Sequence, residues 1–185
     1  MLKNSTLSYG WLSIVFHWVS AIIVIGMFAL GWWMVDLNYY SSWYTDAPHY
    51  HKSVGLLLVA LMLVRLTWNL SQKTPTPLGT KWEIKAAKLA HLLLYLLVFS
   101  LFISGYLIST ADERGITIFN WFTLGSLGRF FAEQEDIAGM VHEYVAYVLI
   151  GLASLHGLAA LKHHFINNDN TLVRMLTIKQ QKEQQ

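Results

Sequence analysis

Histidines are the residues of this chain whose type and spacing point most directly to chemistry. The chain has eight of them and no cysteine, which excludes disulfides, thiolate metal sites and cysteine-bound iron–sulfur clusters. A neutral imidazole ring, by contrast, binds transition metals through one of its nitrogens. Six histidines lie in or beside long apolar stretches, where a polar ring is costly unless it has a partner; these are His17, His51, His91, His142, His156 and His163.

His142 and His156 belong to one apolar stretch and lie 14 residues apart. In a helix this spacing returns to within about 40° of the same face, and the two positions are about 21 Å apart along the axis. One helix therefore offers two metal ligands at two depths, and each ligand needs a partner from another helix. The spacing does not favour a zinc site, because zinc needs its ligands gathered at one point.

Partners at matching depths come from two other stretches. His17 and His156 each lie six residues inside the same expected end of the bundle, and His51 and His142 both lie near the opposite end. The first two can bracket an inner haem and the second two an outer haem, because haem iron accepts histidine as an axial ligand. With both axial positions filled, the iron favours electron transfer over oxygen binding.

Two further histidines compete for these positions. His91 is expected at the depth of His17 and His156, so it could replace either ligand, hydrogen-bond a haem propionate or contact a quinone. His49 competes with His51, but it lies in a polar turn at the start of the stretch. We therefore favour His51 as the ligand.

Arg65 and His163 each have two interpretations. Arg65 follows His51 by 14 residues, so it lies on the same helical face at the inner depth. It either pairs with a haem propionate or extends its charge to the membrane surface. His163 follows His156 by seven residues, about 10 Å nearer the chain's C-terminal side. It either hydrogen-bonds a quinone or helps its polar neighbours anchor the helix among anionic lipid headgroups.

Four apolar stretches must position these residues, and each is long enough to cross a bilayer, which takes about 20 helical residues. Only 13% of residues are charged, against about 25% in a typical soluble domain. Stretches 14–35 and 89–109 are apolar all round, whereas core helices of a soluble bundle keep a polar face. We expect an all-α integral membrane four-helix bundle forming a single domain over residues 1–185, with spans at about 11–35, 49–70, 86–110 and 137–161 and a tail at about 162–185.

Lysine and arginine predict the orientation, because they accumulate in the cytoplasmic connections of membrane proteins. Nine of them lie at the N-terminus, in the second connection or after the fourth stretch, and three lie on the other side. Both termini and the second connection are therefore predicted to be cytoplasmic. The polar segment 179–185 is expected to be disordered on that same side.

Several segments around the histidines match one family. They are FHW at 16–18, HKSVG at 51–55, AHLLLY at 90–95, HE at 142–143, HG at 156–157, KHHF at 162–165 and DNTL at 169–172. On these segments the chain resembles the bacterial cytochrome b561 family over nearly its whole length. That family is related to the membrane cytochrome b subunits of nickel hydrogenases and formate dehydrogenases.

The resemblance implies two non-covalent b haems, one held by His17 and His156 and the other by His51 and His142. It implies a multi-pass protein of the bacterial inner (plasma) membrane in a respiratory chain, with ubiquinone or menaquinone as one redox partner. Resemblance to the stand-alone members also implies superoxide:quinone oxidoreductase activity, with superoxide oxidised on the outer face.

Charge on the expected outer face bears on that activity. The face carries seven acidic and three basic residues, and an acidic face does not steer an anion such as superoxide inward. An unknown periplasmic donor, either a protein or a small molecule, is therefore an equal expectation.

Functions of other classes also compete with a quinone-linked carrier. A haem-bearing membrane anchor subunit of a dehydrogenase or hydrogenase-like complex would dock through the aromatic-rich connection 116–128. A haemless bundle would leave His17, His142 and His156 unexplained. We expect no nucleic-acid partner.

Overall fold

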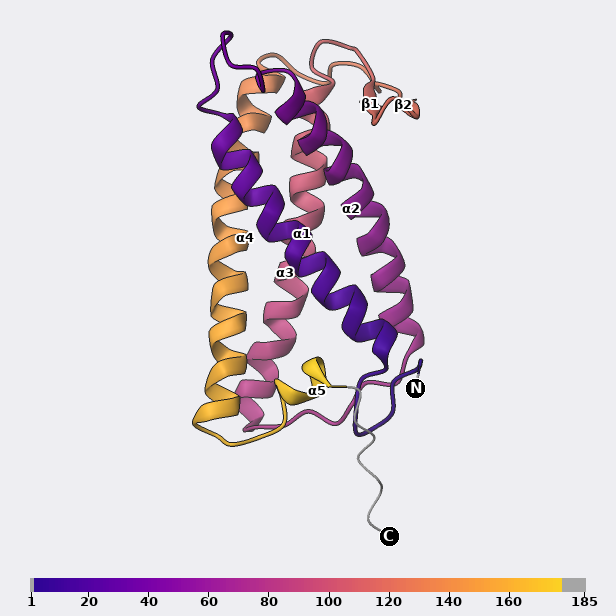
Figure 1. Cartoon of the computed structure of the whole chain (residues 1–185), viewed down its shortest axis with the longest axis vertical. Helices are drawn as coiled ribbons and strands as arrows, with labels where there is room; N and C mark the ends of the chain where they lie inside the picture. The colour runs from indigo at the N-terminus through magenta and orange to yellow at the C-terminus, as the bar shows by residue number, and fades with distance from the viewer. Residues whose placement is uncertain (1, 178–185) are drawn as a thin grey trace.

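Four long helices make up most of the computed structural model, which describes residues 2–177 (Figure 1). All four are long and apolar enough to cross a membrane, so the prediction of four span-length helices is confirmed. The chain is mostly helical rather than all-α, because a short β-hairpin that was not predicted lies between the third and fourth helices. The elements are α1 (Trp11–Met34), α2 (Asp46–Ser71), α3 (Lys81–Ser109), β1 (Ile116–Ile118), β2 (Phe122–Leu124), α4 (Gln134–Phe165) and α5 (Val173–Leu176).

Three helices, α2, α3 and α4, begin before their predicted spans, whereas α1 matches its predicted span to within one residue. α3 begins at Lys81, five residues earlier than predicted, because Thr80 and Glu83 form a capping box. The Glu83 carboxylate accepts from the Thr80 backbone N–H at 2.7 Å, and Thr80 Oγ1 accepts from the Glu83 N–H at 3.4 Å. This exchange satisfies two donors that the first helical turn would otherwise leave unpaired.

The predicted tail is partly structured. α4 continues to Phe165, so residues 162–165 belong to the helix rather than to the tail. Residues beyond it fold back as α5, where the Arg174 guanidinium donates to the Thr76 carbonyl at 2.7 Å and the Trp18 indole donates to the Met175 carbonyl at 2.7 Å. The segment 179–185, expected to be disordered, lies outside the described residues.

Neighbouring helices run antiparallel and define two ends of the bundle (Figure 1). The hairpin end holds the α1–α2 connection and the strands β1 and β2, which pair antiparallel with Thr117 opposite Thr123. The terminus end holds the N-terminus, the α2–α3 connection and α5. α1 packs chiefly on α2, and α3 chiefly on α4. The two helical pairs meet around an apolar cluster formed by Leu58, Met62, Val98 and Leu149.

Candidate functional site

Two pairs of histidine rings face each other, one pair toward each end of the bundle. In the hairpin-end pair, His51 of α2 faces His142 of α4 with ring centres 6.2 Å apart. In the terminus-end pair, His17 of α1 faces His156 of α4, also with ring centres 6.2 Å apart. All four residues are half-buried. The structure therefore brings together the partners that helical depth predicted.

This ring separation is suited to one metal ion between two imidazoles. Bonds from a metal to histidine nitrogen are about 2.0 Å long and the nitrogen lies about 1.1 Å from the ring centre, so two opposed ligands have centres about 6 Å apart. Haem iron takes histidine at its axial positions. Both pairs thus fit a bis-histidine haem on ring separation, and their role as ligands stays a prediction.

Glycines of neighbouring helices lie against the hairpin-end pair. A Cβ atom added to Gly31 of α1 would lie 3.1 Å from His51 Cε1, and one added to Gly105 of α3 would lie 3.2 Å from His142 Cε1. Both distances are shorter than ordinary carbon contacts. Glycine at these two positions therefore lets the rings approach the α1 and α3 backbones closely, and a larger residue would have to push the rings back by a few tenths of an ångström. Among the described residues, nothing lies within 4 Å of such a Cβ at Gly26, Gly139, Gly151 or Gly157.

The two rings of the hairpin-end pair differ in their hydrogen bonds. His142 Nδ1 lies 3.0 Å from the hydroxyl oxygen of Ser104. His51 Nδ1 is buried and has no hydrogen-bond partner within residues 2–177. Metal-bound histidines usually donate their second ring N–H to an acceptor. Of the two rings, His142 therefore has the more complete surroundings for metal binding.

The Arg65 side chain of α2 contacts the terminus-end pair through His17. Its Nη2 lies 3.0 Å from His17 Nδ1, and its Nη1 donates to the Ser20 hydroxyl at 2.6 Å. The guanidinium also lies 5.6 Å from the centre of the Tyr95 ring. Because a guanidinium only donates hydrogen bonds, His17 Nδ1 must accept here, which leaves the proton of the neutral ring on Nε2. For Nε2 to bind iron, the proton of the neutral ring would have to move to Nδ1, which could then no longer accept a hydrogen bond from Arg65.

Of the two competing histidines, His91 lies beside a predicted ligand and His49 does not. His49 lies beside Phe119 of the β-hairpin, with ring centres 6.4 Å apart, so the structure brings His51 and not His49 to His142. His91 is exposed, and its ring centre lies 5.0 Å from that of His156. The terminus end therefore gathers a third imidazole beside the pair.

His163 lies apart from both pairs and belongs to the fold of the C-terminal segment. Its Nδ1 is 2.5 Å from Asp169 Oδ2, and a Cβ at Gly79 would lie 2.9 Å from its Cε1. Partial burial acts to raise the pKa of the Asp169 carboxyl, but hydrogen bonds from Thr171 and His163 outweigh it and hold the pKa below its usual value. The contact ties the segment after α4 back to the helix.

Sequence reasoning missed the two serines that contact the functional side chains, Ser20 and Ser104. Both are buried, and both donate to carbonyls of their own helix. One available signal was a hydroxyl inside an apolar span three residues after His17, which places Ser20 on the same helical face. Ser104 had no such local signal, because the ring that it contacts belongs to another helix.

Comparison with known proteins identifies the family of the chain. The family described as "Prokaryotic cytochrome b561" matches residues 8–177. "Cytochrome b561 homolog 2" of Escherichia coli (strain K12) is 48% identical over 175 residues, covering 94% of this chain and 93% of the relative. "Probable superoxide oxidase CybB" of Yersinia pestis is 31% identical over 183 residues, covering 92% and 97%. The chain therefore belongs to the prokaryotic cytochrome b561 family of membrane cytochromes, which carry b-type haem.

Proposed function

We propose that the chain is a di-haem cytochrome that transfers electrons across the bacterial inner membrane between a periplasmic donor and the quinone pool. The observation that supports this most directly is the 6.2 Å ring separation, which occurs at both ends of the bundle. His51 and His142 hold one haem, and His17 and His156 hold the other. Bound haem supplies a one-electron carrier, while the protein orients it and tunes its electronics.

Charge supports the proposed orientation. The lysines and arginines concentrate at the terminus end, so this end faces the cytoplasm and the hairpin end faces the periplasm. The hairpin-end pair is then the outer site and the terminus-end pair the inner site. Cytochromes with sites near both surfaces can pass an electron from one side of the membrane to the other.

Arg65, His91 and His163 have supporting roles at the inner site. The Arg65 guanidinium, already in contact with His17, pairs with a haem propionate, because a charge-assisted contact stabilises a carboxylate in apolar surroundings. His91 neighbours His156 without replacing it. His163, positioned by Asp169, contacts the quinone, because an imidazole can donate a hydrogen bond to a quinone carbonyl.

Superoxide is a specific candidate for the donor, since the Yersinia pestis relative is named for its oxidation. The local charges give it little support: Arg114 pairs with Asp112 at 3.2 Å, and the Arg129 Nε donates to the Phe131 carbonyl at 3.1 Å. A test is the rate of superoxide consumption by purified protein with quinone. A rate far above that of His142→Ala supports this donor, and equal rates exclude it.

The di-haem assignment is tested by extracting non-covalent haem from detergent-purified protein and counting it per polypeptide. We expect two haems per chain in the wild type and one in His51→Ala, His142→Ala, His17→Ala and His156→Ala. His49→Ala is the matched control, because its ring faces the β-hairpin, and it should retain two. One haem in the wild type would overturn the two-site proposal, and none would overturn the cytochrome mechanism for these residues.

A further inference from the structure

The Ser104 hydroxyl lies between its own helix and a ring proposed to bind iron. Its oxygen is 2.9 Å from the Ser100 carbonyl and 3.2 Å from the Leu101 carbonyl, and it donates toward them. A hydroxyl has one proton to donate and two lone pairs that accept. At 3.0 Å from His142 Nδ1, the oxygen therefore acts as an acceptor. His142 Nδ1 then carries the ring proton, and Nε2 keeps its lone pair.

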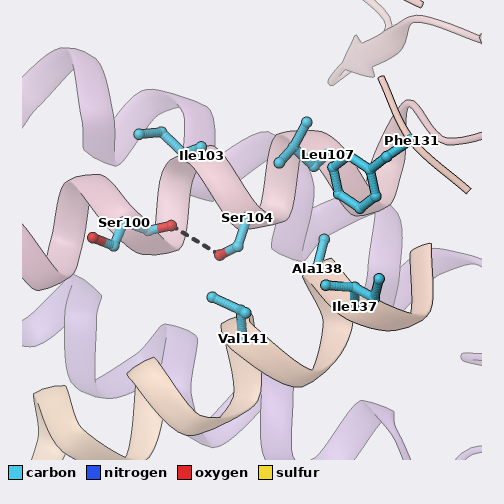
Figure 2. A pocket seen from close by; sticks show the side chains of 8 residues that line it. All are labelled: Ser100, Ile103, Ser104, Leu107, Phe131, Ile137, Ala138 and Val141. Carbon is cyan, nitrogen blue, oxygen red and sulfur yellow. Dashed lines mark hydrogen bonds between the residues drawn. The ribbon is translucent and has the colours of Figure 1, made fainter. Parts of the chain in front are cut away.

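Ser104 supplies the side-chain oxygen that contacts His142 Nδ1, and the Leu101 backbone carbonyl also lies within hydrogen-bonding reach of the His142 ring. Ser104 is 4% exposed, so solvent does not replace its hydroxyl. Figure 2 shows it in a groove between α3 and α4 whose remaining lining side chains are apolar except for Ser100. The residue that follows, Gly105, would bring a Cβ within 3.4 Å of His142 Nδ1. Two adjacent residues of α3 therefore fix one edge of the ring, one by hydrogen bonding and the other by the absence of a side chain.

We propose that Ser104 is a positioning residue for the hairpin-end haem, acting through His142. By accepting the Nδ1–H bond it selects the tautomer in which Nε2 binds iron, holds the ring plane and raises the electron donation of the ligand. Stronger donation stabilises ferric over ferrous iron, so this bond lowers the reduction potential of the hairpin-end haem. The inference rests on the proposed function, because it requires His142 to be an axial ligand.

The chain provides a matched control for removing this hydroxyl. Ser154 of α4 makes the same kind of bond to its own helix, to the Ile150 carbonyl at 2.8 Å, but its side chain is exposed and has no bond to a histidine among the described residues. Ser154→Ala therefore reports what the loss of an intrahelical serine bond does by itself. Ser104→Thr keeps a hydroxyl at the tested position, so it shows whether a hydroxyl there is enough to retain the wild-type reduction potential.

Spectroelectrochemical titration of the two haems is the test. In Ser104→Ala we expect the ferric-to-ferrous ratio of the hairpin-end haem to fall threefold to tenfold at a fixed potential, tenfold being 59 mV for one electron. The other haem should not change, Ser104→Thr should restore the ratio, and Ser154→Ala should match the wild type. The low-spin ferric resonance of the same haem should shift with the potential, because the ring orientation is also released.

Different results would contradict the ligand assignment of the proposed function and the role of Ser104. If His142→Ala retains both haems, the ligand assignment of the proposed function is wrong, and the role of Ser104 falls with it. If His142→Ala removes one haem but Ser104→Ala leaves both potentials and both resonances unchanged, the Ser104 inference alone is wrong. An equal shift in Ser104→Ala and Ser154→Ala would also overturn it, because the cause would then be general to the helix.

Discussion

The hairpin-end and terminus-end pairs share one ring separation but have different neighbours. The hairpin-end pair touches neutral groups: glycine backbones and the Ser104 hydroxyl. The terminus-end pair touches the Arg65 guanidinium and has the His91 ring beside it. Helix packing therefore sets the spacing at both ends in the same way, while side chains from other helices make the two sites electrostatically unlike.

This difference predicts a direction for the electron. A cation near iron stabilises the state with less positive charge, which is the ferrous state, and the effect is large in apolar surroundings. The terminus-end haem should therefore have the higher potential. Ser104 acts in the same sense by lowering the potential of the hairpin-end haem. Transfer from the hairpin-end haem to the terminus-end haem should then be downhill, which in the proposed orientation is from the periplasmic side to the cytoplasmic side.

The largest effect should come from filling the glycine contact of the hairpin-end pair. In Gly105→Val even the first added carbon lies 3.2 Å from His142 Cε1, and overpacking of this kind costs about 1–3 kcal/mol. Haem content should fall from two toward one per chain. Gly139→Val in α4 is the control, since a Cβ there meets nothing within 4 Å among the described residues. Equal haem content in the two variants would contradict a tight contact at His142.

Removing the cation should lower the potential at the other end. In Arg65→Met the terminus-end haem should become harder to reduce by tens of millivolts, as expected on the order of magnitude for one lost charge nearby. The hairpin-end haem should keep its potential, and Arg65→Lys should lie between the wild type and Arg65→Met. Redox titration of both haems checks this. A uniform shift of both haems would show that Arg65 acts on the whole bundle rather than on one site.

The pairs were predictable from sequence because helical geometry fixes depth. His142 and His156 lie on one α4 face, and only a few histidines match either level. The contacts that distinguish the two ends were not predictable, because they depend on how the helices rotate against each other. Spacing alone placed Arg65 at the right depth but could not show that its guanidinium contacts His17 Nδ1. The fold of α5 was missed for the same reason, since its bonds to Trp18 and Thr76 join residues 157 and 98 positions apart in the chain.

A smaller effect is expected from the third imidazole. His91→Ala should retain two haems, because the His17–His156 pair already has the separation of two opposed ligands. Its exposed ring lies 5.0 Å from His156, so its loss should change only the spectrum of the terminus-end haem slightly. Haem counting and the reduced-minus-oxidised spectrum measure this. Loss of one haem would mean that His91 is a ligand and that the two ends differ in ligand choice as well.

The smallest effect should come from the contact that holds the C-terminal segment at the terminus end. In Asp169→Asn, hydrogen exchange of backbone amides in 169–177 should speed up about twofold to fivefold, because a hydrogen-bonded side-chain pair this close to the surface contributes roughly 0.4–1 kcal/mol. The pKa of Asp169 is lowered in the folded chain, so its contribution is present above the ordinary carboxyl pKa and is lost as pH falls through the lowered one.

The wild type should therefore approach the variant only on acidification below about pH 4. Asp112→Asn is the control, because it removes a carboxylate paired with Arg114 in the other end's connection. It should leave exchange in 169–177 unchanged. The reduction potential of the terminus-end haem should be measured in the same variant. If that potential changes in Asp169→Asn while Trp18 loses its bond to Met175, the C-terminal segment contributes to the difference between the two ends of the bundle. If only the exchange rates change, the segment covers that end without tuning it.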